Sequence, residues 1–105
     1  MPLKKSPLAT FFASRLHNMW PEMYGTWEEA INDYARNKSA EKLKAIRKEL
    51  KEIIQQEHDE GTLRRIVTKD LGANYYAPGD NLTYQEWLQE VYDMLGEWVK
   101  KNFTT

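Results

Sequence analysis

The chain has 105 residues, of which 41% are hydrophobic and 30% charged, and its net charge is −1. This length allows one domain, which we expect to span residues 1–105, and the absence of cysteine excludes disulfides, thiol nucleophiles and Cys-ligated metals. No segment approaches the roughly 20 apolar residues of a membrane span, and no signal-peptide pattern is present, so we expect a cytoplasmic protein.

The first third of the chain contains two helix start signals. Ser6 followed by Pro7 is typical of a helix N-terminus, because the hydroxyl caps free N–H groups and proline fits the first turn. Apolar residues then recur at helical spacing as far as Trp20, where Pro21 is expected to end the helix. Residues 26–29, Thr-Trp-Glu-Glu, form a capping box that opens a second helix.

A third, highly charged helix is predicted from Ser39, with Gly61 interrupting the pattern after it. A short helix should follow and end at Gly72, because glycine is the usual residue just beyond a helix C-terminus. His58 and the two acidic residues after it look like the end of one helix and the acidic start of the next. Acidic residues alternate with the basic ones on the third helix, so this helix does not favour nucleic acid.

The last third of the chain begins with an irregular stretch and ends in a long helix. Residues 73–82 contain the turn sequence Pro-Gly-Asp, and Thr83 and Glu86 form a second capping box. Every predicted helix has an apolar stripe on one face only, so the helices must pack on each other. We therefore predict an all-α fold, a compact single-domain bundle of five or more short helices.

The end of the chain is acidic. No lysine or arginine lies between Asp70 and Val99, although this stretch contains six acidic residues. Four of them follow a spacing of four, three and four residues and would form one stripe on the last helix: Glu86, Glu90, Asp93 and Glu97. The stripe could simply be a solvated helix face, but surfaces that serve only solubility usually mix charges. It therefore favours a cationic protein partner over nucleic acid.

The irregular stretch is a second candidate binding element. It carries Asn74, Tyr75, Tyr76 and Asp80, and tyrosine suits a binding site because it buries a large area while keeping a polar tip. The alternative is that the tyrosines fill the core beneath the loop. Because the two are adjacent, one could point inward and one outward.

The sequence offers little support for catalysis. His17 lies near the apolar face of the first predicted helix, which is typical of a structural histidine. His58 has no second histidine at metal-ligand spacing, and the five glycines are too scattered for a phosphate-binding loop. We expect no catalytic, cofactor-binding or metal-binding residues.

Three stretches carry a family resemblance: FFASRLHNMW, TWEEAINDY and LGANYYAPGDNLTYQEWLQEVYDML. They resemble the CdiI proteins, the small immunity proteins of bacterial contact-dependent growth inhibition systems, over roughly residues 8–99. The resemblance implies a non-enzymatic cytoplasmic inhibitor that covers the active site of a cognate toxin domain. Many such toxins are nucleases with basic clefts, so we expect a nuclease, and an RNase in particular.

The expected contact surface combines the acidic residues with the irregular stretch. It consists of Asp70, Asn74, Tyr75, Tyr76, Asp80, Glu86, Glu90, Asp93 and Glu97. We expect no direct contact with nucleic acid or membrane. The alternative function is that of a helical adaptor or regulatory protein that binds another basic protein, and a third is a minor enzyme that uses His17 or His58.

Overall fold

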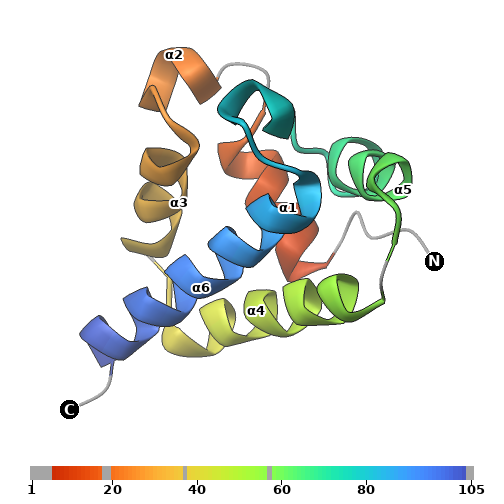
Figure 1. Cartoon of the computed structure of the whole chain (residues 1–105). Helices are drawn as coiled ribbons and strands as arrows, with labels where there is room; N and C mark the ends of the chain where they lie inside the picture. The colour runs from red at the N-terminus through yellow and green to blue at the C-terminus, as the bar shows by residue number, and fades with distance from the viewer. Residues whose placement is uncertain (1–5, 18–19, 37, 57, 104–105) are drawn as a thin grey trace.

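The computed structural model describes residues 6–17, 20–36, 38–56 and 58–103, and this part of the chain is helical with no strand (Figure 1). Its elements are α1 (Pro7–Arg15), α2 (Trp20–Tyr24), α3 (Trp27–Arg36), α4 (Ala40–Gln55), α5 (Glu60–Arg65), the π-helix η1 (Ile66–Asp70), the 3₁₀-helix η2 (Ala77–Asp80) and α6 (Tyr84–Phe103). The predicted all-α bundle is confirmed. Among the described residues, no helix combines the length and apolar character needed to cross a membrane.

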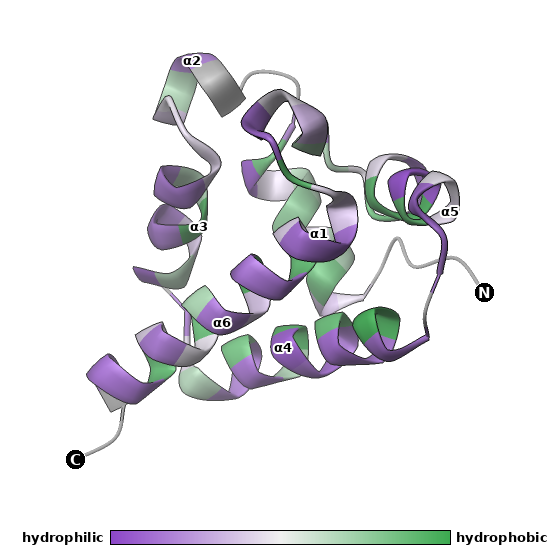
Figure 2. Cartoon of the chain, viewed as in Figure 1, coloured by the Kyte–Doolittle hydropathy of each residue, from purple (hydrophilic) through white to green (hydrophobic). Residues whose placement is uncertain are grey.

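The long helix α6 crosses the middle of the molecule and packs most extensively on α4 (Figure 1). Its Trp87 is fully buried and lies at the meeting point of three other segments. The Trp87 ring centroid is 5.3 Å from that of Phe12 on α1, 6.0 Å from that of Trp27 on α3 and 4.4 Å from that of Tyr75. Apolar faces turn toward this centre and charged faces turn outward (Figure 2).

The α4–α6 contact depends on a close approach at Gly96. Arg47 on α4 donates a hydrogen bond from Nε to the carbonyl oxygen of Tyr92 at 3.0 Å, and its guanidinium carbon lies 3.9 Å from the centroid of the Tyr92 ring. A Cβ atom at position 96 would lie 2.6 Å from a guanidinium nitrogen of Arg47. Glycine therefore leaves the space in which Arg47 packs across α6.

The first predicted helix is shorter than expected. Ser6 caps α1 as predicted, by accepting a hydrogen bond from the N–H of Ala9 at 3.1 Å. The helix ends at Arg15, however, and Pro21 lies in the first turn of α2 instead of ending α1. The reason is tertiary: the carbonyl oxygen of Leu16 accepts a hydrogen bond from the N–H of Asn74 at 2.7 Å, which fixes the chain just beyond α1.

The prediction that Gly61 interrupts the helices is wrong in detail. Gly61 is the second residue of α5, and Asp59 caps that helix by accepting a hydrogen bond from the N–H of Thr62 at 2.7 Å. The predicted acidic start of a helix is thus correct. The helix then widens into η1 before Gly72, whose φ of +75° is the left-handed conformation that glycine adopts readily.

The start of α6 is held by two sets of carboxylate contacts. Thr83 and Glu86 form both hydrogen bonds of the predicted capping box, at 2.9 and 3.0 Å. In addition, the carboxylate of Glu60 accepts hydrogen bonds from the N–H of Tyr84 at 2.6 Å and from the N–H of Gln85 at 3.0 Å. A side chain of α5 therefore caps α6 and ties the two helices together.

We predict that Glu60→Ala lowers the free energy of unfolding by about 1–2 kcal/mol, because two N–H groups of α6 lose a charged acceptor. Urea unfolding followed by circular dichroism measures this change. Glu41→Ala is the matched control, since Glu41 also lies in the first turn of its helix. This control should lower the free energy of unfolding by about 0.5 kcal/mol or less. Equal losses in the two variants would contradict the inter-helix role of Glu60.

Candidate functional site

The candidate site is organised by the segment that connects η1 to α6. Residues 71–77 run from the end of η1 to the start of η2, and along them buried and exposed positions alternate. Two backbone hydrogen bonds fix this segment: the N–H of Ala73 donates to Val67 at 2.9 Å, and the N–H of Asn74 donates to Leu16 at 2.7 Å. The alternation decides which side chains of the segment face solvent.

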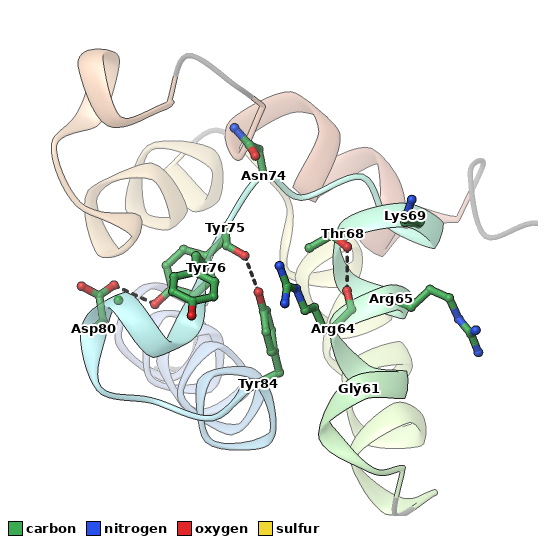
Figure 3. A pocket seen from close by; sticks show the side chains of 11 residues that line it. Gly61, Arg64, Arg65, Thr68, Lys69, Asn74, Tyr75, Tyr76, Asp80 and Tyr84 are labelled. Atoms are coloured by element: carbon green, nitrogen blue, oxygen red, sulfur yellow. Dashed lines mark hydrogen bonds between the residues drawn. The ribbon is translucent and has the colours of Figure 1, made fainter.

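The two adjacent tyrosines point in opposite directions. Tyr75 is only 4% exposed and its ring stacks on that of Trp87, whereas Tyr76 is 58% exposed. The hydroxyl of Tyr75 donates to the carboxylate of Asp80 at 2.7 Å, and the hydroxyl of Tyr84 donates to the carbonyl oxygen of Tyr75 at 2.7 Å (Figure 3). The prediction of one inward and one outward tyrosine is confirmed.

One side of the segment borders an acidic hollow of about 440 Å³. We use this name for the depression between the start of α3, the end of η2 and α6. The residues that line it are Gly25, Thr26, Trp27, Glu28, Asp80, Leu82 and Glu90. Three of these residues carry carboxylates, and none is a lysine or arginine. The three carboxylates are exposed to solvent, so the hollow presents concentrated negative charge to a partner.

The same three carboxylates affect the tyrosine beneath them. Burial raises the pKa of Tyr75 far above its usual value, and the hydrogen bond to Asp80 and the negative charges of Asp80, Glu28 and Glu90 raise this pKa further. A phenolate would be repelled at this position. Tyr75 is therefore held neutral, as the hydrogen-bond donor that orients Asp80.

The other side of the segment borders a second, larger hollow of about 800 Å³, which we call the basic hollow (Figure 3). One wall is α5 and η1, and the other is the tyrosine segment with the start of α6. Its lining residues are Gly61, Arg64, Arg65, Thr68, Lys69, Asn74, Tyr75, Tyr76, Gly79, Asp80 and Tyr84. Three of them are basic, and Asp80 is shared with the acidic hollow.

The structure separates the other predicted contact residues from this segment. Asp70 lies with Glu49, Glu52 and His58 around a depression between α4 and η1. Asp93 and Glu97 lie farther along α6, beside Arg47.

The four acidic residues of the predicted stripe are all exposed: Glu86, Glu90, Asp93 and Glu97. Of these, Glu90 alone joins Asp80 in the acidic hollow, and Glu86 also serves in the capping box.

Sequence reasoning missed Glu28 and Arg64. In the sequence Glu28 stands only within the capping box of residues 26–29, and the packing of α3 against α6 places it near Glu90. Arg64 lies in a short amphipathic stretch with no motif of its own. Neither residue has a local sequence signal, because each gains its neighbours through tertiary contacts.

The two histidines do not form a site. His17 lies beyond the end of α1 and is partly buried, which corrects its predicted place within the helix. His58 contacts Gln56, with 2.8 Å between Nε2 and Oε1. In the described part of the chain, no group of three or more histidine or acidic side chains is arranged to hold a metal ion.

Comparisons with known proteins identify one family. The family model described as CdiI immunity protein matches residues 5–95. A chain in the crystal structure of the CdiA-CT/CdiI complex from Y. kristensenii 33638 is similar in fold, with a TM-score of 0.80 and 19% sequence identity over 86% of this chain and 91% of that chain. No curated protein sequence matches.

We predict that Tyr75→Phe lowers the free energy of unfolding at neutral pH by about 0.5–1.5 kcal/mol, because it removes the hydrogen bond to Asp80. In the wild type, stability should also fall above about pH 10, where the unfolded chain releases the phenol proton that the folded chain retains, by about 1.4 kcal/mol per pH unit. Tyr75→Phe should make this fall shallower. Urea unfolding across this pH range measures both effects.

Tyr76→Phe is the matched control for the loss of a phenol hydroxyl, since Tyr76 is the exposed neighbour. It should leave stability at neutral pH unchanged. An alkaline stability profile of Tyr75→Phe identical to that of the wild type would contradict the conclusion that Tyr75 is held neutral in the folded protein.

Proposed function

We propose that this chain, which belongs to the CdiI immunity protein family, binds a CdiA-CT toxin domain and blocks its active site. Immunity proteins of this family inhibit toxins and are not enzymes. The sequence likewise predicts a non-enzymatic inhibitor. We further propose that the protein acts in the cytoplasm, where an incoming toxin would meet its substrate.

The observation that supports the finer proposal is the gathering of Glu28, Asp80 and Glu90 around the acidic hollow. A cleft that binds phosphates is basic, and a surface of opposite charge is attracted to it over distances of about 10 Å at moderate salt. Carboxylates at the hollow would take the place of substrate phosphates. We therefore propose that the toxin is a nuclease, and an RNase in particular.

The remaining predicted contact residues extend this surface. The exposed side chains along α6 would act mainly on the rate of association, since charges at the rim of an interface steer the partner and add little affinity. Tyr76 would be the anchor, because exposed tyrosines that become buried often dominate the binding energy. A complete interface needs on the order of 800 Å² per partner, which the hollows, the tyrosine segment and the α6 stripe could supply together.

Buried Tyr75 has a different part in this proposal. It is unavailable for contact, since only 4% of it is exposed, but its hydroxyl orients Asp80. Asn74 is exposed and remains a proposed contact. Asp70 lies beside α4 and would touch the toxin only if the interface continues past η1.

The test is inhibition of RNA cleavage by the cognate CdiA-CT domain. Wild-type protein should abolish cleavage at a one-to-one ratio. The double variant Glu28→Lys/Glu90→Lys should be needed at about tenfold higher concentration or more, because two attractive contacts become repulsive. The readout is the concentration of inhibitor that halves the cleavage rate.

Glu41→Lys/Glu52→Lys changes the net charge equally at exposed positions of α4 and is the matched control. It should inhibit nearly as well as the wild type. A toxin that cleaves no RNA would exclude the RNase assignment. Equal inhibition by the two double variants would move the interface away from the acidic hollow.

A further inference from the structure

The basic hollow adds a second, opposite charge to the candidate surface. Arg64 points from α5 toward the tyrosines, whereas Arg65 and Lys69 point outward from the same wall (Figure 3). The guanidinium carbon of Arg64 lies 5.6 Å from the centroid of the Tyr76 ring. Burial raises the pKa of the Tyr84 hydroxyl, and the positive charge of Arg64 acts in the opposite direction. Arg64 is thus the central cation of this hollow.

No described carboxylate neutralises the three cations of this hollow in an ion pair. Among the described residues, neither Arg64, Arg65 nor Lys69 forms an ion pair. Asp80 lines the same hollow, but its carboxylate accepts the hydrogen bond of Tyr75 on the far side (Figure 3). The positive charge on the α5 side of the hollow is therefore not neutralised by an ion pair with a described carboxylate.

We propose that the basic hollow receives an acidic segment of the toxin, with a carboxylate placed against Arg64 and an apolar side chain against Tyr76. This inference rests on the proposed function. It implies that the toxin is recognised through charges of both signs. The toxin presents a cationic region to the acidic hollow and an acidic region to the basic hollow, on either side of the tyrosine segment. A partner with basic charge alone would satisfy one hollow only.

Charge and composition favour a protein partner over nucleic acid. A phosphate chain passing through the basic hollow would run into Glu28, Asp80 and Glu90 next to it, and phosphates are repelled by such charge. Arginine and tyrosine are both among the residue types enriched at energetic centres of protein interfaces. The volume of about 800 Å³ accommodates a few side chains of a partner.

One experiment, surface plasmon resonance with the immobilised toxin domain, separates the contribution of the positive charges to binding from that of the negative charges. Arg64→Glu/Lys69→Glu should weaken binding by about tenfold or more, because an acidic segment would meet two carboxylates. If binding depended on negative charge alone, the same variant would bind a cationic toxin equally well or more tightly. The direction of the change therefore decides the question.

Lys44→Glu/Lys51→Glu, at exposed positions of α4, is the matched control, and it should bind as tightly as the wild type or more tightly. Thermal melting checks that each variant is folded. Arg64→Gln is the milder second variant, in case the reversal prevents folding, and should weaken binding about threefold.

Unchanged or tighter binding by Arg64→Glu/Lys69→Glu, or by Arg64→Gln if that variant alone folds, would overturn the inference while leaving the proposed function intact. Binding of a labelled single-stranded RNA that is lost in the variant, with toxin affinity unchanged, would also overturn it and assign the hollow to nucleic acid. Failure of the wild-type protein to bind the toxin would overturn the proposed function together with this inference.

Discussion

The stacking of Tyr75 on Trp87 is the contact on which the candidate surface depends. Trp87 joins α1, α3 and α6 at the centre of the core, and Tyr75 brings the segment before α6 onto it. With Tyr75 buried and the backbone of Tyr76 extended, the alternation of the segment places Tyr76 in solvent. The hydroxyl of Tyr75 then fixes Asp80, which borders both hollows.

The surface that results has a charge boundary along one segment. Glu28 and Glu90 lie on one side of Asp80, and Arg64 lies on the other side beyond Tyr76. Glu60 strengthens this arrangement, because its carboxylate ties α5, which carries Arg64, to the start of α6. Under the proposed function, a surface of mixed charge would favour one toxin over others, since a wrong partner would meet like charge on at least one side.

Much of the fold could be predicted because helix signals are local. The caps at Ser6 and Thr83, the stop at Gly72 and the apolar stripes all follow from nearby residues. The early end of α1 could not be predicted, because it depends on a hydrogen bond between Leu16 and Asn74. The family and its non-enzymatic character were correctly inferred from the overall pattern. The predicted contact residues remain proposals, and their division between two hollows depends on tertiary packing that no single stretch of sequence encodes.

The most direct test of the central claim is titration calorimetry of the wild-type protein with its CdiA-CT domain at low and at physiological ionic strength. We predict one-to-one binding that is tight in both conditions and clearly weaker at the higher ionic strength, because salt screens exposed charges such as Glu28 and Glu90. Tight binding that does not change with salt would contradict the claim that the charged surface around the tyrosine segment recognises the toxin. Absence of binding would contradict the proposed function itself.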